Sequence, residues 1–202
     1  TIAHLKWLKT LELSALQRET LDEYLLTYEY LTEKISRFDE RIEELASAER
    51  YKEKVKHMSC LIGIKTHTAL SMIVEVGDFE RFEKAPKFAS FLGLVPSEDS
   101  SDARVNRYSI TKAGNCHLRR LLVEAAQSYT RGNVGHKSMA LKQRQKRNSP
   151  EVIAHADKAS ERLRRRFYKM TLKKGVNRNV ATTAIARELA CFIWGMMTEH
   201  VS

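Results

Sequence analysis

The sequence has few of the residues that stabilise secreted or metal-clustered proteins. Only three cysteines occur in 202 residues, widely spaced at Cys60, Cys116 and Cys191. An odd and scattered set argues against a disulfide framework and against a zinc cluster. This usage is typical of the reducing cytoplasm, which is where we expect the protein.

Turn residues and long apolar runs are scarce as well. Eight glycines and three prolines favour long helices with few turns. No uninterrupted apolar run reaches the length of a membrane span, and the first residues lack the apolar core of a signal peptide, so we expect no membrane partner. A hydrophobic fraction of 43% still suffices for a core. We predict an all-α protein, with a long coiled-coil helix followed by a compact helical domain.

Charge is distributed unevenly along the chain. Residues 1–50 hold seven basic and eleven acidic residues, whereas residues 104–178 hold 20 basic and four acidic residues, a net charge of +16. Such a basic segment is the electrostatic footprint of a protein that binds phosphate groups, and it indicates a nucleic-acid partner. The alternatives are a solvated basic surface and pairing with the acidic first part.

The first predicted domain, residues 1–50, contains one long helix over roughly residues 2–48. Its apolar residues recur at alternating spacings of three and four: Leu21, Tyr24, Tyr28, Leu31, Ile35, Phe38, Ile42 and Leu45. An unbroken heptad seam requires a partner helix. We predict a coiled coil that joins two chains into a homo-oligomer, and the alternatives are pairing with a helix of the same chain or packing on the second domain.

The second predicted domain, residues 51–202, begins with a pattern similar to a helix-hairpin-helix. A short apolar turn around Gly63 leads into a helix over roughly residues 66–76, with Thr66 as its N-cap. Backbone N–H groups at such a helix start can bind a DNA phosphate, and Lys65 adds a positive charge there. Lys65 and Thr66 are therefore candidate nucleic-acid ligands, and an ordinary corner between helices is the alternative.

Residues 94–115 form the one long polar segment of the chain, and we expect a loop there. It mixes hydroxyl groups with cations: Ser97, Ser100, Ser101, Ser109, Thr111, Arg104, Arg107 and Lys112. This combination suits phosphate binding, or nucleophilic attack on phosphorus with the charge held by arginine and lysine. A solvated loop is the alternative.

The helices after this segment carry further candidates. Arg119 and Arg120 stand near the start of a helix expected over residues 116–131, where cations oppose the helix dipole unless an anion is bound. We include both, together with Asn115, among the candidate nucleic-acid ligands. The last helix, near residues 178–199, is expected to be a core helix that buries apolar residues from Val180 onward, although Arg187 and Glu188 interrupt its apolar surface.

Three blocks in the second domain carry a family resemblance. They read LIGIKTHTALSMIVEVGDFERF, FASFLGLVPSEDSS and ITKAGNCHLRRLLVEAAQSY, in this order from residue 61. Together they resemble the C-terminal transposase domain of the insertion-sequence-110 family, whose members are DNA transposases related to the Piv DNA invertases. The helix expected over residues 2–48 and the last helix resemble the family's dimerising and closing segments.

The resemblance implies a DNA transposase that supplies a serine nucleophile for strand cleavage and exchange. The family's serine lies five residues after the proline of the GLVP block, which corresponds to Ser101, with Ser100 as the neighbouring candidate. The next residue is Asp102, where the family has glycine. The rival hypothesis is a non-enzymatic helical protein that binds nucleic acid through its hairpin and basic helices.

The family's cofactor and partners follow from the same resemblance. Its members hold Mg²⁺ with acidic residues of an N-terminal RNase H-like domain, which nothing in this sequence resembles. We therefore expect no cofactor in this chain, and we expect the chain alone not to cut DNA. DNA is the implied partner, and some members add a bridge RNA as guide. The implied location is the bacterial nucleoid.

Overall fold

The computed structural model of the chain describes residues 2–101 and 104–200, so Asp102 lies outside the described residues, as do the side chains of residues 99–108. Its internal contacts divide the chain into two units, residues 1–42 and residues 43–202.

The first unit holds α1 (Ile2–Thr10) and most of α2 (Ala15–Ser47). The prediction of one continuous helix over residues 2–48 is wrong, because the chain leaves the helical conformation between α1 and α2. Ser14 precedes α2, and its backbone N–H donates to Gln17 Oε1 at 3.1 Å. This is half of a capping box, which marks a helix start. The Ser-Ala-Leu-Gln sequence already contained that signal.

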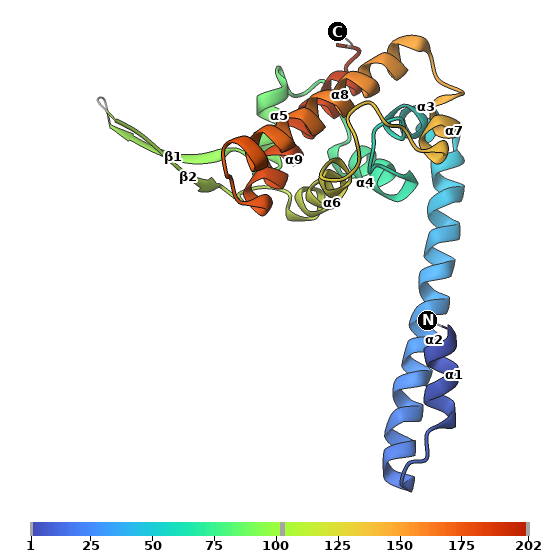
Figure 1. The fold of residues 1–202 in the computed structure, drawn as a ribbon. Helices are drawn as coiled ribbons and strands as arrows, with labels where there is room; N and C mark the ends of the chain where they lie inside the picture. Colours follow the sequence, from blue (N-terminus) through green and yellow to red (C-terminus); the bar gives the residue numbers. More distant parts are fainter. Residues whose placement is uncertain (1, 102–103, 201–202) are drawn as a thin grey trace. The chain divides into compact units, whose positions relative to one another are not determined.

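Helix α1 folds back along the first part of α2 (Figure 1). The Arg18 guanidinium donates to the carbonyl oxygens of Leu8 and Leu11, and Leu25 is buried. The predicted seam stays uncovered in its central part. Five consecutive seam residues are between 49% and 71% exposed: Tyr24, Tyr28, Leu31, Ile35 and Phe38. Helix α1 therefore leaves the central seam residues uncovered and is not the partner that the seam requires.

The second unit is built from helices, which confirms the all-α prediction. They are α3 (Glu49–Met58), α4 (Thr66–Val76), α5 (Ala85–Phe91), α6 (Cys116–Ala126), α7 (Met139–Gln145), α8 (Pro150–Tyr168) and α9 (Arg178–Met197). A 3₁₀ turn, Gln127–Tyr129, extends α6, and a π-helical turn, Lys169–Lys173, extends α8.

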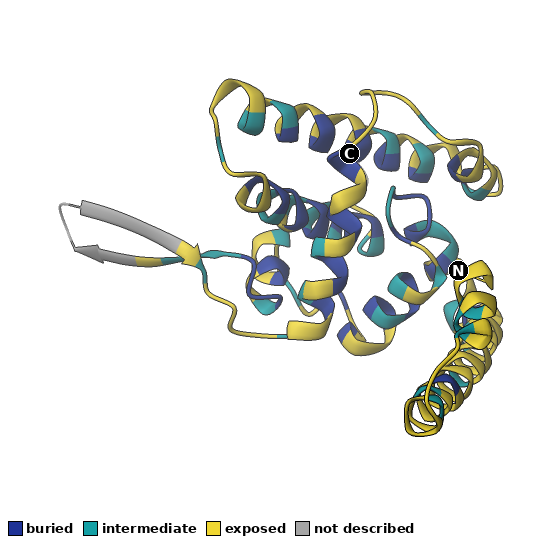
Figure 2. Cartoon of the chain, turned by 60° about the horizontal axis from the view of Figure 1, so that its bottom comes forward, coloured by how far each residue is buried: buried dark blue, intermediate teal, exposed yellow. Residues whose placement is uncertain are grey.

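Helix α9 is the central element of this unit and packs against α3, α5, α6 and α8. Figure 2 shows buried residues gathered on the facing sides of these helices. By length and composition alone α9 could cross a membrane, but 56% of its most apolar window is buried inside the protein. Ile185, Leu189 and Ile193 are fully buried. This is the environment of a core helix.

A β-hairpin occupies much of the segment that we expected to be a loop, so that expectation is wrong. Strand β1 (Pro96–Ser101) pairs antiparallel with β2 (Arg104–Ile110). Few apolar residues alternate along these strands, so the sequence lacks the signal of a half-buried strand. Because an isolated two-stranded hairpin is marginally stable in water, its attachment to the helices is important.

The turn between α3 and α4 packs tightly against α6. Gly63 has a φ of +80°, and a Cβ atom at this position would lie 2.3 Å from the Ala125 carbonyl oxygen. The helix expected over residues 66–76 is confirmed. Its N-cap is Lys65, however, and Thr66 is the first helical residue, so the prediction of Thr66 as N-cap is wrong.

Candidate nucleic-acid interface at the base of the hairpin

The hairpin is fixed at its base between the end of α5 and the start of α6. Backbone pairing continues past the strands through three hydrogen bonds: Thr111 N–H to Val95 O at 2.9 Å, Lys112 N–H to Gly93 O at 3.2 Å, and Asn115 N–H to Phe91 O at 3.1 Å. Both ends of the hairpin are thus attached to helices that pack against α9. This attachment gives a short polar hairpin a defined position.

Two glycines allow the close backbone approach at this base. Gly114 has a φ of +120°, and a Cβ atom there would lie 2.1 Å from the Phe91 carbonyl oxygen. Gly93 has a φ of +66°, and its Cβ atom would lie 2.4 Å from the Ala113 carbonyl oxygen. Only glycine combines this conformation with this approach. The Gly residues of the LGL and AGN sequences are therefore required by the anchorage of the hairpin.

Asn115 and Arg119, two of the candidate nucleic-acid ligands, make structural contacts at the same place. Asn115 is the N-cap of α6: its Oδ1 accepts from the Leu118 N–H at 2.9 Å, and its Nδ2 donates to Glu75 Oε2 at 2.8 Å. The Arg119 guanidinium donates to the Leu92 carbonyl oxygen at 3.0 Å. Both side chains thereby position the residues that carry the hairpin.

Lys65 and Thr66 lie apart from this base. Helix α4 runs antiparallel to α6, because Glu75 near its C-terminus contacts the start of α6, whereas Gly63 before it contacts the end of α6. The length of α4, roughly 16 Å for its eleven residues, therefore separates Lys65 from Asn115. The structure does not bring all candidate nucleic-acid ligands together.

The remaining basic candidates are at or near the hairpin. Lys112 is exposed at its base, with a φ of +55°. Arg120 is exposed on α6 and pairs with Glu124 at 3.1 Å. Arg104 and Arg107 belong to β2 by their backbone, and their side chains lie outside the described residues.

The candidate serines are on the other strand. Ser101 is the last residue of β1 and pairs in register with Arg104, the first residue of β2, while Ser100 pairs with Val105. Ser101 is five residues after Pro96, which corresponds to roughly 17 Å along an extended strand. The register places the backbone of Ser101 at the end of the hairpin far from the base. The side chains of both serines lie outside the described residues.

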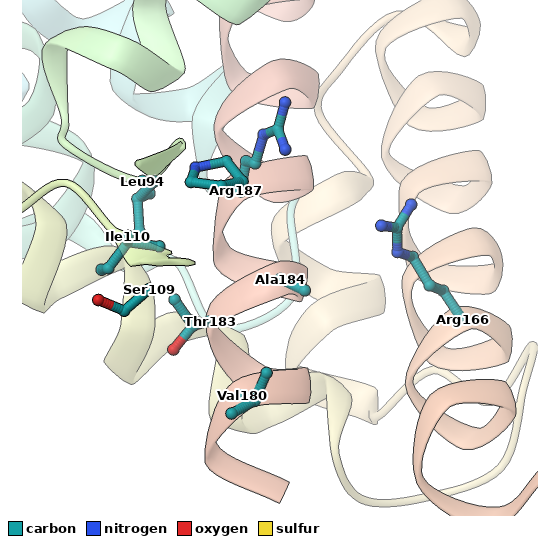
Figure 3. A pocket seen from close by; sticks show the side chains of 9 residues that line it. Leu94, Ser109, Ile110, Arg166, Val180, Thr183, Ala184 and Arg187 are labelled. Atoms are coloured by element: carbon teal, nitrogen blue, oxygen red, sulfur yellow. The ribbon is translucent and has the colours of Figure 1, made fainter. Parts of the chain in front are cut away.

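A groove with a volume of about 280 Å³ is present at the base of the hairpin (Figure 3). Its walls come from the hairpin base, from α8 and from α9. The lining residues are Leu94, Pro96, Ser109, Ile110, Arg166, Val180, Thr183, Ala184 and Arg187. The groove thus combines an apolar surface with two hydroxyl groups and two guanidinium groups, and no carboxylate lines it.

Positive charge exceeds negative charge around this groove. The carboxylate of Glu188, whose side chain is 11% exposed, forms ion pairs with Arg166, at 3.0 Å, and with Arg162. Arg187, which directly precedes Glu188 in α9, is exposed. No ion pair joins Arg187 to a carboxylate among the described side chains. Three guanidinium groups and one carboxylate therefore lie in or beside the groove, and this excess of positive charge would attract an anion.

Sequence reasoning missed this groove. We expected Val180 to be buried, but it is 59% exposed and lines the groove. The available signal was Arg187, a charged residue within an otherwise apolar helix. That interruption was interpreted only as the surface of a core helix, because the sequence does not reveal that α9 passes the base of the hairpin.

The implied Mg²⁺ has no suitable ligand set in the described part of the chain. Within residues 2–101 and 104–200, no group of three or more histidine, cysteine, aspartate or glutamate residues could hold a metal ion. The lining of the groove is cationic and hydroxylic, which suits an anion and not a divalent cation. The described residues therefore do not fit the metal.

Comparison with known proteins identifies the relatives of this segment. Residues 56–140, which include α4, α5, the hairpin and α6, match the family described as Transposase IS116/IS110/IS902 family. The transposase for insertion sequence element IS1533 of Leptospira borgpetersenii is 29% identical over 86% of this chain and 50% of its own length. The transposase for insertion sequence element IS1111A of Coxiella burnetii is 30% identical over 78% of this chain and 36% of its own length.

A further relative, the y4qE protein of Sinorhizobium fredii, also carries the word transposase in its name. It is 38% identical over 70% of this chain and 36% of its own length. The chain therefore spans between about a third and a half of the length of these three relatives. Residues 56–140 are thus similar to the Transposase IS116/IS110/IS902 family, and between 70% and 86% of the chain is similar to proteins that are named as transposases.

Proposed function

We propose that this chain is the part of a DNA transposase that binds DNA and supplies the serine nucleophile for transposition of an insertion sequence. The observation that carries the proposal is the anchored hairpin. One of its strands ends at Ser101, and its base forms a groove lined by two guanidinium groups and no carboxylate. Two proteins similar to this chain are named as transposases of insertion sequences, which supports the same function.

The proposed chemistry is attack of a serine hydroxyl on a DNA phosphodiester. The Ser101 Oγ–P bond forms as the bond between phosphorus and the leaving oxygen of the DNA strand breaks, and the hydroxyl proton passes to a base. A serine hydroxyl is a weak nucleophile and needs activation. We propose that the activating group lies in another part of the transposase. Arg104, which pairs in register with Ser101, and Arg107 on the same strand would neutralise charge on the attacked phosphate, whereas Lys112 at the base would bind a different phosphate of the DNA.

The nucleophile is tested in the full-length protein by comparing Ser101→Ala with Ser100→Ala. We expect Ser101→Ala to abolish strand transfer and the covalent protein–DNA product, while DNA affinity stays within about twofold, since only the attacking oxygen is removed. Ser100→Ala is the matched control and should retain the covalent product. Full strand transfer by Ser101→Ala, or its loss only in Ser100→Ala, would show that Ser101 is not the nucleophile.

DNA binding by residues 1–202 is tested with a labelled duplex and fluorescence anisotropy at several salt concentrations. Neutralising phosphates releases counterions, so we expect affinity to fall at least about tenfold between 50 and 200 mM salt. Affinity that does not depend on salt would favour a coiled-coil interaction protein with an incidental basic surface. An RNA competitor in the same assay tests the proposal that a guide RNA is also a partner.

A non-enzymatic nucleic-acid-binding protein is the second candidate function. The cationic groove favours it equally, because the groove explains binding without any chemistry. Binding in the anisotropy assay combined with unaltered recombination by Ser101→Ala would support this candidate. In either case we propose that the protein acts on the bacterial nucleoid.

We also propose that the exposed seam of α2 pairs with a second copy of the chain. Ile35 is 60% exposed in the middle of this seam, and a buried charge at that position would break the helix pair. Sedimentation should therefore show that Ile35→Asp converts a dimer to a monomer. Ser36→Asp, which adds the same charge at an exposed position away from the seam, should leave the dimer intact.

A further inference from the structure

We propose that the groove at the base of the hairpin binds one unpaired nucleotide of the DNA strand. The base would contact the apolar side of the groove, and its phosphate would lie near the guanidinium groups of Arg166 and Arg187. This inference rests on the proposed DNA binding and adds a specific function for the groove. By binding this nucleotide, the groove would fix the position of the DNA strand relative to the hairpin.

The apolar side of the groove provides a surface for a base. Ile110 comes from the hairpin base, and Val180 and Ala184 come from α9. Leu94 also borders the groove but is only 1% exposed, so it adds little surface. Val180 is 59% exposed although it belongs to the helix that forms the core. Small-ligand sites are lined mainly by apolar side chains with a few polar groups, which is the composition found here.

The polar groups lie where a nucleotide would present its phosphate and hydrogen-bonding edge. Figure 3 shows the guanidinium groups of Arg166 and Arg187 on the α8 and α9 side, with Leu94, Ser109 and Ile110 on the side of the hairpin. The Thr183 hydroxyl donates to the Asn179 carbonyl oxygen at 2.9 Å. It is therefore left with acceptor capacity toward the groove. The two cations and the acceptor favour an anionic ligand that also carries donors.

The size of the groove restricts the ligand to a single nucleotide. Its volume of about 280 Å³ lies just below the range of roughly 300–1,000 Å³ that is typical of small-molecule sites. A base pair within a duplex cannot enter such a groove, so the nucleotide has to leave the stack. Enzymes that bind extrahelical bases hold them in pockets of this kind, and unstacking costs least where the base is already unpaired.

The position of the groove at the base of the hairpin links nucleotide binding to the proposed reaction at Ser101. Pro96 lines the groove and also begins the strand that ends at Ser101. A nucleotide held at the base therefore fixes the strand relative to the candidate nucleophile, at a separation of roughly 17 Å along the strand. The groove would thus contribute to the choice of the phosphodiester that is presented to Ser101.

The test uses residues 1–202 and three duplexes in the anisotropy assay: a perfect duplex, a duplex with one bulged adenosine, and the same bulge with an abasic sugar. The two bulged duplexes share phosphates and flexibility, so their difference reports the base alone. We expect the bulged adenosine to bind at least about fivefold more tightly than the abasic bulge, the equivalent of about 1 kcal/mol.

Two variants locate the base. Ala184→Phe fills the groove without changing its charge and should abolish the preference for the bulged adenosine while affinity for the perfect duplex stays within about twofold. Val180→Glu places a carboxylate at an exposed position of the groove and should have the same effect on the preference. Asn179→Glu is the matched control, because it adds the same charge on the same helix at a residue that does not line the groove.

The outcomes separate this inference from the proposed function. Salt-dependent binding of the perfect duplex, with equal affinity for the adenosine and abasic bulges, would overturn the nucleotide site and leave DNA binding intact. No binding to any duplex would overturn both. A preference that survives Ala184→Phe and Val180→Glu would place the base elsewhere. If Ala184→Phe alters the oligomeric state and no base preference exists, the groove is a protein contact and the inference fails.

Discussion

The seam of α2 and the buried face of α6 show how similar sequence patterns reach different structural states. Both place apolar residues at helical spacing, yet Leu31 in the seam is 49% exposed, whereas Leu122 on α6 is completely buried. Leu122 belongs to a helix that packs against α9 within the same chain. The five central seam residues have no helix of the described chain over them.

The comparison shows that periodicity identifies a face that needs a partner but not where the partner comes from. On α6 the partner is α9, which lies 50 or more residues later in the chain. On α2, helix α1 folds back alongside the helix but leaves the central seam residues exposed. The exposed seam therefore fits the proposed contact between copies, and the following experiments test whether the two faces differ as described.

The largest effect is expected from truncating the buried face. Leu122→Ala should lower the free energy of unfolding by about 2–5 kcal/mol, because it removes buried methyl groups and leaves a cavity. Leu31→Ala, the matched change in the seam, should lower it by less than about 0.5 kcal/mol under dilute, monomeric conditions. Chemical denaturation of both variants measures this. Equal losses would show that the seam is already covered in the monomer.

A somewhat smaller effect is expected at the base of the hairpin. Gly114→Ala should cost about 2–3 kcal/mol, because it adds steric contact with the Phe91 carbonyl oxygen to an unfavourable φ. Gly175→Ala is the matched control: it has a φ of +62° but no atom within 4 Å of its Cβ position. It should cost only about 1 kcal/mol. Thermal unfolding of the two variants separates close approach from backbone strain.

Removing the helix cap should have a moderate effect. Asn115→Ala should destabilise the protein by about 1 kcal/mol, because the Leu118 N–H loses its acceptor. Asn115→Ser, which keeps a capping oxygen, should recover part of this loss. Denaturation curves measure the stability. If Asn115→Ala instead leaves stability unchanged and weakens DNA binding, Asn115 is a nucleic-acid ligand and not mainly a cap.

The smallest effect concerns pH. Burial raises the pKa of the Cys60 thiol to about 11, so the folded thiol stays protonated where the unfolded thiol already ionises. The stabilisation that comes from keeping the buried Cys60 thiol neutral is complete below the pKa of the thiol in the unfolded chain. It is lost as pH rises through about 11, the pKa in the folded protein. We expect a loss of about 1 kcal/mol or less between pH 8 and pH 10. Cys60→Ala should flatten this decline, and an unchanged slope would contradict it.

Several structural features were accessible from the sequence because they depend on local chemistry. The helix over residues 66–76 follows from helical periodicity and is confirmed. Helix α8 likewise starts at a standard N-terminal signal, with Ser149 as N-cap and Pro150 as the first helical residue. The break before α2 was also accessible, since Ser14 and Gln17 form a capping-box sequence. It was missed because the apolar pattern of the long helix dominated the interpretation.

Part of the candidate site was not accessible in this way. The polar hairpin has no strand pattern of its own and depends on backbone contacts such as that between Phe91 and Asn115, which lie 24 residues apart. The structural contacts of Arg119 and Asn115 were not predicted, because a basic or polar residue does not reveal in sequence whether it binds a group of its own chain. Their role as nucleic-acid ligands stays a prediction. The function of Ser101 stays a prediction.

The sequence by itself determined the helical character of the protein, the apolar seam of α2 and the family relationship of residues 56–140, because each depends on residue type and spacing along one segment. Only the tertiary structure decided that α9 passes the base of the hairpin and forms a groove there with Arg166 and Arg187. Such a groove requires segments more than 80 residues apart to meet, and their meeting is decided by packing of the whole core and not by any local pattern.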